Sequence, residues 1–339
     1  MSNETVTRGL GWLRLSGSPR DLGLALGRAG RAAVAQNLLV HPLWQMVNAP
    51  AQAARVARMA ETTRARFPWI WTEIEGLAEG LGLPIWQVFA WNCRGDLLAS
   101  VPDGCTTVML PGPEPMLAHN EDGLPFFRDT CFIAEAHPEG RPGFQAFCYP
   151  GSIPGHTFAF TGAGLVQAVN NLRLVGVEPG IPRMVLGRAL LATGSLAAAL
   201  ELLRDAPSGG FHFALMQRGD PRILSVEFGG GGYSVKEIDA AAIHANHALH
   251  LRGALTAQTI TDSSRDRQAR GEALVAAGHE PLAILRDTGG SGLPIRRAAT
   301  DDPDEENTLG TAMMRLSGQR LDWSIHDGAD GPARYSGTA

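Results

Sequence analysis

Cys105 has the chemical features of a covalent catalyst, and it lies in the segment Pro102-Asp103-Gly104-Cys105-Thr106-Thr107-Val108-Met109-Leu110. The β-branched and apolar residues after it predict a short buried strand. If the Gly104–Cys105 peptide bond were broken, Cys105 would carry both a thiol and a free α-amine. A thiol with a pKa of about 8.5 and an α-amine with a pKa of about 7.7–8.0 can exchange a proton near neutral pH. One residue would then supply both nucleophile and base.

Gly104 suits the same chemistry, because glycine tolerates the strained backbone that an acyl shift from nitrogen to sulfur requires. The alternative is that Cys105 is a buried thiol after an ordinary Asp-Gly turn. The other cysteines are predicted to be core thiols, because the spacing of all four fits neither paired metal ligands nor a disulfide framework. They are Cys93, Cys131 and Cys148.

Neither a metal site nor a phosphate-binding loop is predicted. His244, His247 and His250 are close in sequence, but they do not share a face if residues 241–246 form a strand. The run Gly229-Gly230-Gly231-Gly232 lacks the lysine and the following helix of a phosphate loop, so a hairpin is expected there. We therefore expect no metal and no cofactor.

Composition narrows the range of partners. The chain has 339 residues, a hydrophobic content of 44% and a formal net charge of -5, and Lys236 is its only lysine. These features argue against nucleic acid as a partner. The sequence shows neither a basic start followed by an apolar run nor an apolar stretch of about 18 residues. We therefore expect a cytoplasmic protein without a membrane partner.

The segment before Cys105 is predicted to be mostly helical. A strand at residues 11–16 precedes a helix that Ser18 caps and Pro19 begins, and this helix continues to about residue 34. Further helices are expected at residues 51–67, 68–80 and 83–91. Glycines along these helices indicate close helix packing, namely Gly23, Gly27, Gly30, Gly76, Gly80 and Gly82.

After Cys105 the pattern changes to short apolar segments between Gly/Pro turns. They predict strands at residues 106–110, 115–119, 131–136, 144–149, 157–161, 164–170, 210–218, 222–227, 233–237 and 241–246. Helices are expected between them, at residues 181–191 and 195–204. Separate runs of strands and helices predict an α+β fold in which helices cover two sheets. Residues 298–307 are expected to form an acidic surface loop, and residues 336–339 a frayed end.

A series of short motifs runs along the chain in a recognisable order. The motifs before the Cys105 segment are Arg66-Phe67-Pro68-Trp69, residues 73–78 and Trp91-Asn92-Cys93-Arg94. The motifs after it are His119-Asn120-Glu121-Asp122, Gly162-Ala163-Gly164-Leu165, Asn170-Asn171, Gly180-Ile181-Pro182, Ala245-Asn246-His247 and Asp262-Ser263-Ser264-Arg265. Together they resemble the isopenicillin-N acyltransferase family of cysteine N-terminal-nucleophile (Ntn) hydrolases. The resemblance extends over roughly residues 10–328.

The resemblance implies an αββα sandwich with a mostly helical N-terminal pro-region, made as an inactive precursor that cleaves itself before Cys105. Residues 1–104 would then be the pro-region, or α-subunit, and residues 105–339 the catalytic β-subunit. The two products would remain one folded α/β heterodimer. Whether this heterodimer forms a further homo-oligomer stays open.

Site roles follow from the same resemblance. Cys105 would be the nucleophile, its α-amine the base, and Asn246 the side-chain donor to the oxyanion. Asp122 would orient the new N-terminus, and Asn170 would lie near the tetrahedral intermediate. The chemistry agrees, because an uncharged amide stabilises a developing oxyanion and a carboxylate holds an α-ammonium while raising its pKa.

Asn120 and Thr106 are further candidates for contact with the substrate or the oxyanion. Structural alternatives remain for several of these residues. Asp122 precedes a glycine and could belong to a turn, and Asn170 could end a strand. Asn246 is harder to explain structurally, because asparagine is depleted in strands.

The chain departs from the family pattern at two places. The family's Asn-Trp-Asp stretch is Asn120-Glu121-Asp122 here, which adds a carboxylate beside the site. A family arginine is missing before Thr308-Leu309, where Glu305 and Glu306 occur, and Arg296 or Arg297 could replace it. Arg94 either pairs within the core or touches substrate, and the structural role is favoured.

The leading hypothesis is a self-processing amidohydrolase that cleaves a linear amide bond of a small N-acyl amine or N-acyl amino acid through a Cys105 thioester. The first alternative is an acyltransferase that moves an acyl group from a thioester donor such as acyl-CoA to an amine. The second is an unprocessed, non-catalytic homologue, against which the presence of Cys105, Asn246 and Asp122 argues. The penicillin acyl exchange of the fungal family member is not transferred to this chain.

Overall fold

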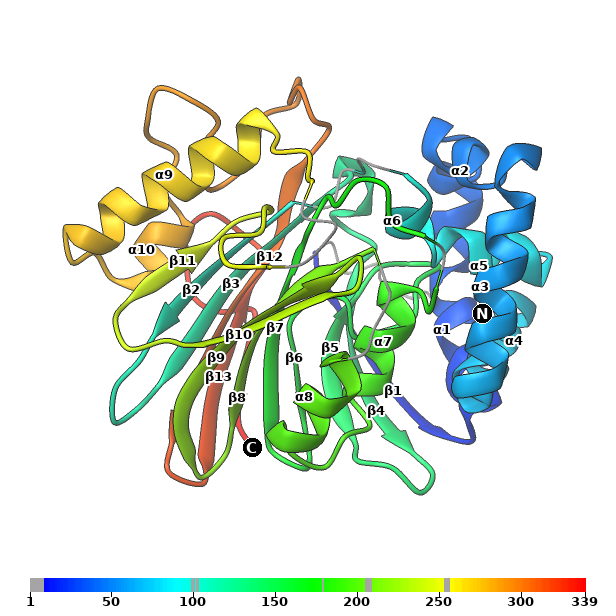
Figure 1. The fold of residues 1–339 in the computed structure, drawn as a ribbon, viewed down its shortest axis with the longest axis horizontal. Helices are drawn as coiled ribbons and strands as arrows, with labels where there is room; N and C mark the ends of the chain where they lie inside the picture. The colour runs from blue at the N-terminus through cyan, green and yellow to red at the C-terminus, as the bar shows by residue number, and fades with distance from the viewer. Residues whose placement is uncertain (1–8, 99–100, 102–103, 179, 205–208, 253–256) are drawn as a thin grey trace, which may run out of the picture.

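Two β-sheets lie at the centre of the molecule, as the computed structural model in Figure 1 shows. The structure describes residues 9–98, 101, 104–178, 180–204, 209–252 and 257–339. The turn expected at Pro102 and Asp103 lies outside these residues. The larger sheet has eight strands in the order β1-β4-β5-β6-β7-β8-β9-β10, and the smaller has six in the order β11-β2-β3-β12-β13-β14.

Each sheet is built from two separate blocks of the chain. Those of the eight-stranded sheet are β1 (Gly11–Gly17), β4 (Phe132–Pro138), β5 (Phe144–Cys148), β6 (Ala159–Thr161), β7 (Leu165–Asn171), β8 (Phe211–Gln217), β9 (Asp220–Gly229) and β10 (Gly232–Glu237). Those of the six-stranded sheet are β2 (Cys105–Leu110), β3 (Met116–Gly123), β11 (Ala242–His244), β12 (Asn307–Ser317), β13 (Arg320–His326) and β14 (Tyr335–Thr338).

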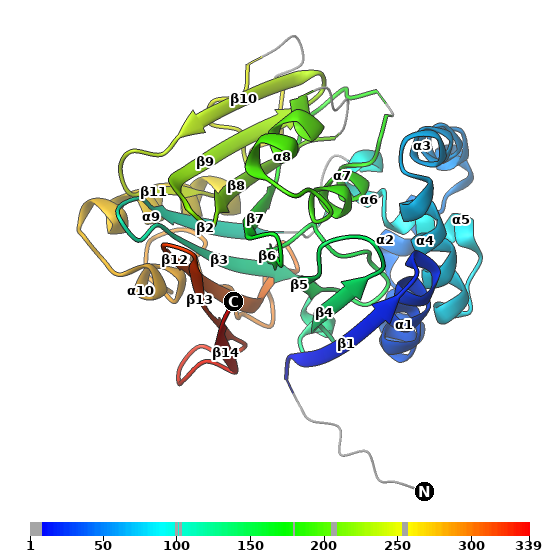
Figure 2. The ribbon, with the colours of Figure 1, turned by 90° about the horizontal axis from the view of Figure 1, so that it is seen from below.

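Helices cover both outer faces of the paired sheets. The helices α7 (Arg183–Leu190) and α8 (Leu196–Arg204) lie on the eight-stranded sheet, and α9 (Asp262–Ala276) and α10 (Pro281–Leu285) lie on the six-stranded sheet (Figure 2). Strands β2 and β3 face β7 across the gap between the sheets. The expected αββα sandwich of the α+β class is therefore confirmed.

The N-terminal segment forms a helical layer beside this sandwich. Its helices are α1 (Pro19–Ala33), which continues as a π-helical turn (Val34–Leu38), α2 (Pro42–Val47), a 3₁₀ turn (Pro50–Gln52), α3 (Ala53–Arg66), α4 (Pro68–Leu81), α5 (Ile85–Trp91) and α6 (Arg94–Leu97). Ser18 caps α1 as expected, and it forms a capping box with Asp21. Strand β1 pairs in parallel with β4, which joins this segment to the eight-stranded sheet.

Glycines allow α1 and α4 to cross at backbone contact, which confirms the expected packing role for Gly23, Gly27, Gly76 and Gly80. Gly30 instead faces Pro150 and Gly151, and Gly82 is the left-handed residue that ends α4. A Cβ on Gly76 would meet the Arg20 carbonyl oxygen, and one on Gly27 would lie 2.7 Å from the Cα of Gly80. The two helix axes can approach so closely because glycine has a hydrogen atom in place of a side chain.

Two expected elements differ from the structure. Strand β11 ends at His244, so Asn246 follows the strand instead of lying in it. The C-terminal residues are not frayed, because β14 pairs with β13 from Tyr335 to Thr338. The Gly229 to Gly232 run closes the β9–β10 hairpin as expected, and Cys93, Cys131 and Cys148 are free, buried thiols.

No helix in the described part of the chain is both long enough and apolar enough to cross a membrane.

Candidate functional site

Cys105 is the first residue of β2, which lies between β11 and β3 in the six-stranded sheet. Its backbone N–H donates to Asn246 Oδ1 at 2.9 Å. Its carbonyl oxygen accepts from Arg267 Nη1 at 2.5 Å. Burial raises the pKa of the Cys105 thiol well above its ordinary value, and the carboxylates of Glu121 and Asp122 raise it further. In the uncleaved chain the thiol is therefore protonated at neutral pH.

The carbonyl group of Gly104 is held from the neighbouring strand. The Asp122 backbone N–H donates to the Gly104 carbonyl oxygen at 2.8 Å. The Asp122 side chain lies apart from this contact, because its Oδ1 accepts from the Thr308 hydroxyl at 2.6 Å. Burial raises the pKa of Asp122, against the effect of the Arg267 charge. Both polar atoms of the Gly104–Cys105 peptide bond are thus hydrogen-bonded to sequence-predicted site residues.

Asn246 presents its oxygen, not its amide nitrogen, to Cys105. Its Oδ1 also accepts from Arg267 Nη2 at 2.7 Å, and its Nδ2 donates to the Asn171 carbonyl at 3.3 Å. The Ser264 hydroxyl, on α9, accepts from the Asn246 backbone N–H at 2.9 Å. Asn246 is therefore oriented toward the nitrogen that would become the α-amine if the chain cleaves itself, and its donation to an oxyanion stays a prediction.

Strand register sorts the remaining candidates onto two faces. Cys105 pairs with Glu121 and Thr107 with His119, whereas Thr106 pairs with Asn120. Because side chains alternate along a strand, Asn120 and Thr106 point away from the Cys105 side chain.

The partners of Asn120 and Thr106 agree with this placement. Asn120 Nδ2 donates to the Leu285 carbonyl in α10 at 2.7 Å, and Asn120 Oδ1 accepts from Thr311 at 2.6 Å. Thr106 Oγ1 accepts from Arg267 at 2.9 Å. The structure thus brings Asn246 and the backbone of Asp122 to the peptide bond, but not the Asn120 side chain.

A hydrogen-bonded chain runs from Glu121 to Asn170 on the Cys105 face. The Thr107 hydroxyl lies 2.7 Å from Asn170 Oδ1 and 2.8 Å from His119 Nδ1, and its single proton can go to either. When it goes to His119 Nδ1, His119 Nε2 carries the ring proton and donates to Glu121 Oε2, 3.1 Å away. Burial lowers the pKa of His119 to about 3. Asn170 therefore connects to the Cys105 environment through this chain of described residues.

The Glu121 carboxylate lies beside the thiol. Cys105 Sγ is 3.8 Å from Glu121 Oε2, and the Tyr149 hydroxyl donates to Glu121 Oε1 at 2.7 Å. The extra carboxylate expected from the Asn120-Glu121-Asp122 departure is therefore part of the Cys105 environment.

A small pocket lies beside Cys105 and the start of α7. It is lined by Arg94, Gly95, Cys105, Glu121, His156, Asn171, Arg183, Met184 and Phe211. Arg94 also donates to the Trp91 carbonyl and the Ser152 hydroxyl, both at 3.4 Å. It therefore combines the structural role favoured from the sequence with a place in the pocket wall.

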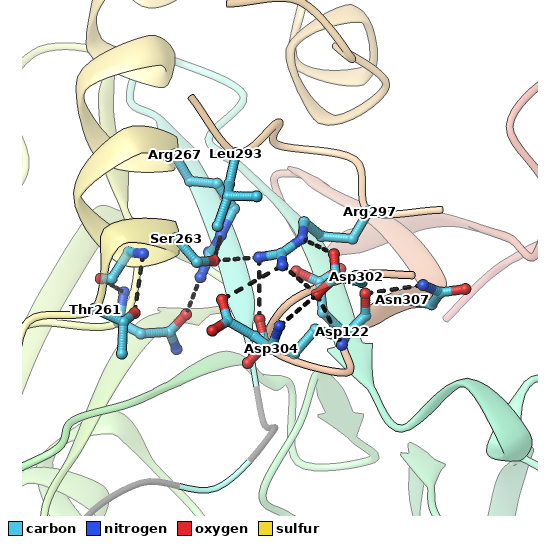
Figure 3. Close-up of polar contacts among 12 residues, drawn as sticks. Asp122, Thr261, Ser263, Arg267, Leu293, Arg297, Asp302, Asp304 and Asn307 are labelled. Atoms are coloured by element: carbon cyan, nitrogen blue, oxygen red, sulfur yellow. Dashed lines mark hydrogen bonds and ion pairs between the residues drawn. The ribbon is translucent and has the colours of Figure 1, made fainter. Parts of the chain in front are cut away.

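The acidic segment at residues 298–307 is exposed over most of its length, as expected for a surface loop, but the side chains of Asp302 and Glu306 turn inward. Arg297, which is fully buried, donates to the Asp302 carboxylate and to the Ser263 hydroxyl, and it lies 3.3 Å from Glu306 Oε2 (Figure 3). Ser263 also accepts from Arg267 Nε at 3.1 Å. Of the two arginines left open by the sequence, Arg297 is therefore the one that connects to the site.

Potential metal ligands gather at the same place. In the described part of the chain, one ligand atom each of Cys105, His119 and Glu121 lie within 4.8 Å of one another. The three histidines considered from the sequence behave differently: His244 Nε2 lies 2.9 Å from Glu227 Oε1, and the His250 backbone donates to Glu227 Oε2 at 2.9 Å. His244 and His250 converge because the chain turns after β11, so their expected separation is wrong.

Sequence reasoning did not single out Arg267, although this side chain contacts Cys105, Thr106 and Asn246. The available signal is its position four residues, or about one helical turn, after Ser263, the second residue of a family motif. The sequence pattern predicts no helix at this position, so it gives no reason to place Ser263 and Arg267 on one helical face.

Comparison with known proteins identifies the family. Residues 110–330 match the model of the family described as "Acyl-coenzyme A:6-aminopenicillanic acid acyl-transferase". The chain belongs to this acyl-transferase family. The matched segment begins after Cys105 and contains Asp122, Asn170 and Asn246, so the resemblance seen in the sequence is confirmed at the family level.

One curated protein similar to this acyl-transferase family member is a β-alanyl-dopamine/carcinine hydrolase from Drosophila melanogaster. It is 29% identical over 164 residues, which cover 42% of this chain and 42% of the relative. The chain thus spans less than half the length of this relative.

Among solved structures, a variant of the conjugated bile acid hydrolase from Clostridium perfringens has a TM-score of 0.43 and 13% identity over 69% of this chain and 92% of that chain. Penicillin V acylase from Agrobacterium tumefaciens has a TM-score of 0.36 and 14% identity over 69% and 84%.

Proposed function

We propose that the chain is a self-processing amidohydrolase that cleaves a linear amide bond of a small N-acyl amine or N-acyl amino acid. Cys105 acts as the nucleophile and forms a thioester with the acyl group. The observation that carries the proposal is that both polar atoms of the Gly104–Cys105 peptide bond are hydrogen-bonded. The Asp122 N–H donates to the Gly104 oxygen, and Asn246 accepts from the Cys105 nitrogen. Residues 1–104 and 105–339 are then the two subunits of the processed enzyme.

Self-cleavage begins with attack of the Cys105 sulfur on the Gly104 carbonyl carbon. The thiol proton passes to the Glu121–His119 pair, whose nearer oxygen is 3.8 Å from Sγ. The Asp122 N–H stabilises the negative charge on the Gly104 oxygen. The carbon–nitrogen bond then breaks, the nitrogen gains a proton, and a Gly104 thioester on Sγ results. Hydrolysis of this thioester releases the Gly104 carboxylate and regenerates the thiol.

Turnover uses the same thiol with a different base. During turnover the α-amine of Cys105 accepts the thiol proton, which is the role that Glu121 has during processing. Asn246 Oδ1 holds the amine, and Arg267 holds the Cys105 carbonyl. Asn171 and Arg94 line the pocket beside Cys105, which is smaller than an acyl group in the uncleaved chain and would have to widen on processing. The relative from Drosophila melanogaster supports a linear amide as substrate, because its name describes hydrolysis of amides of small amines.

The alternative is acyl transfer, which the family description favours because it names an acyl-transferase. Both reactions share the Cys105 acyl-enzyme and differ only in whether water or an amine resolves it. A single experiment separates them: the processed protein is incubated with linear N-acyl amines, including carcinine, and with acyl-CoA plus an amine, and the products are measured by mass spectrometry.

The proposal predicts amine release from at least one amide without any acyl-CoA, and a transient acyl adduct on Cys105. The Cys105→Ala variant serves as the control without a nucleophile. Product formation only when acyl-CoA and an amine are both present would establish the transferase instead. Amide hydrolysis that persists in Cys105→Ala would contradict both reactions.

A further inference from the structure

Glu306 contacts the glycine of the bond that self-cleavage would break. A Cβ placed on Gly104 would lie 2.5 Å from Glu306 Oε2 and 2.9 Å from its carboxyl carbon. Glu306 is 1% exposed. It therefore occupies the space that any larger residue at position 104 would need. This contact gives a second physical reason for glycine before Cys105.

Two guanidinium groups hold the Glu306 carboxyl group in place. Arg173 Nη2 lies 3.4 Å from Oε1, and Arg297 Nη1 lies 3.3 Å from Oε2. Arg173 also donates to the Val101 carbonyl at 3.2 Å, so it reaches the chain just before the cleavage segment. Arg297 is fixed in turn by Asp302, as Figure 3 shows. A carboxyl group with two such partners has a fixed position and can exist as an anion despite its burial.

Glu306 lies on the acyl side of the peptide bond. The amine side is occupied by Asn246, which accepts from the Cys105 nitrogen, and by Arg267, which contacts the Cys105 carbonyl. Glu306 instead packs against the Gly104 α-carbon, next to the carbonyl carbon that water must attack in the second step. The position of Glu306 therefore differs from that of Glu121, beside the sulfur, and from that of Asn246, at the nitrogen.

We propose that Glu306 is the general base that activates water to hydrolyse the Gly104 thioester during self-cleavage. This inference rests on the proposed self-processing function. Water attacks the Gly104 carbonyl carbon while its proton passes to the Glu306 carboxylate. The carbon–sulfur bond breaks, and the Cys105 thiolate leaves and is protonated. The products are the Gly104 carboxylate and a free thiol, with no further reactant required.

The electrostatic setting agrees with a base that works near neutral pH. Burial raises the pKa of Glu306 to about 7, against the lowering effect of the Arg173, Arg267 and Arg297 charges, and the Asp122 carboxyl group also raises it. The carboxylate form is present above this pKa and is lost as the pH falls through it. Thioester hydrolysis should therefore slow below about pH 7.

The decisive variant is Glu306→Gln, which keeps the size of the side chain and removes its basicity. Precursor is made by cell-free synthesis, and processing is followed by intact-protein mass spectrometry with and without neutral hydroxylamine. Hydroxylamine cleaves thioesters without needing a general base. We expect Glu306→Gln to process about 10²- to 10⁴-fold more slowly than wild type. Added hydroxylamine should release a fragment ending in a Gly104 hydroxamate.

Glu305→Gln is the matched control, because it removes a charge from the neighbouring, exposed position. It should process like wild type. Glu306→Gln processing at the wild-type rate would overturn the inference. So would an intact Glu306→Gln chain that hydroxylamine does not cleave, because the block would then precede the thioester.

A pH series on the wild type provides a test that no folding defect can obscure. Spontaneous processing should slow as the pH falls from about 8 to about 5.5, while hydroxylamine should still cleave at Gly104. A rate independent of pH over this range would overturn the role of Glu306. If the wild type neither processes nor responds to hydroxylamine at any pH, the self-processing function itself fails, which is a separate result.

Discussion

Different residues around Cys105 contact the two sides of the Gly104–Cys105 peptide bond. Asn246 and Arg267 hold the amine side, the Asp122 N–H holds the carbonyl oxygen, and Glu121 lies beside the sulfur. The proposed cleavage would convert the Cys105 nitrogen, which already contacts Asn246, into an α-amine. The same contacts can therefore serve first the precursor and then the processed enzyme.

Asn246→Ala should lower kcat by about two to three orders of magnitude in the processed fraction, because it removes the side chain that holds the Cys105 nitrogen and is expected to face the oxyanion. Asn120→Ala is the matched control: its partners are Leu285 and Thr311, so it should lower thermal stability and leave kcat within several-fold. Steady-state kinetics with active-site titration measures both. Unchanged kcat in Asn246→Ala would mean that another group holds the intermediate.

Glu121→Gln should separate processing from turnover. The precursor has no free α-amine, so loss of the Glu121 carboxylate should slow self-cleavage by about 10²- to 10⁴-fold. In molecules that do mature, the α-amine acts as base and kcat should fall much less. Comparing the rate of precursor loss with kcat per processed molecule tests this. Equal losses in both would contradict the division of roles.

At the level of elements, β2 and β3 position the site through their register. Because Cys105 lies opposite Glu121 and Thr107 opposite His119, a row of polar side chains lies on the inner face of the six-stranded sheet. Helix α9 then supplies Ser264 and Arg267 from the outer side of the same sheet. A shift of one residue between the strands would exchange Glu121 for Asn120 beside the thiol.

Gly76→Ala tests the crossing of α1 and α4. Helix propensity alone would favour alanine by about 1 kcal/mol, but the new Cβ would overlap the Arg20 carbonyl oxygen. Overpacking against backbone typically costs about 1–3 kcal/mol, so we expect a lower free energy of unfolding. Gly194→Ala, where nothing lies within 4 Å, is the control and should be neutral. Urea denaturation measures both, and a stabilised Gly76→Ala would refute the packing role.

The limits of prediction follow from what each element buries. Apolar periodicity and caps located the N-terminal helices and most strands, because their buried faces are apolar. Helix α9 was missed because its buried face includes Ser263, Arg267 and Gly271, which carry no apolar stripe. Short motifs located Cys105, Asp122 and Asn246, whereas the burial of Asp302 and Glu306 within the acidic surface loop depends on pairing with Arg297, which sequence spacing does not reveal.

On the scale of the whole molecule, the segment before Cys105 is built into the rest of the fold. Strand β1 pairs with β4 from Gly11–Phe132 to Gly17–Pro138. Arg188 in α7 forms a buried ion pair with Glu73 in α4, with 2.7 Å between Nη2 and Oε2. Removing one member of such a pair typically costs about 3–5 kcal/mol. These contacts do not depend on the Gly104–Cys105 bond.

The two products of self-cleavage should therefore stay together. We expect them to elute as one species in native size-exclusion chromatography and to separate only in denaturant. Elution of the N-terminal fragment by itself under native conditions would contradict the single folded unit. Retention of both fragments in a larger species would add a homo-oligomer of the heterodimer.

Intact-protein mass spectrometry of the wild type beside Cys105→Ala tests the central claim most directly. The account predicts two wild-type masses that divide the chain between Gly104 and Cys105, and a single full-length mass for the variant. A full-length mass in both proteins, or cleavage at this bond in Cys105→Ala, would contradict it.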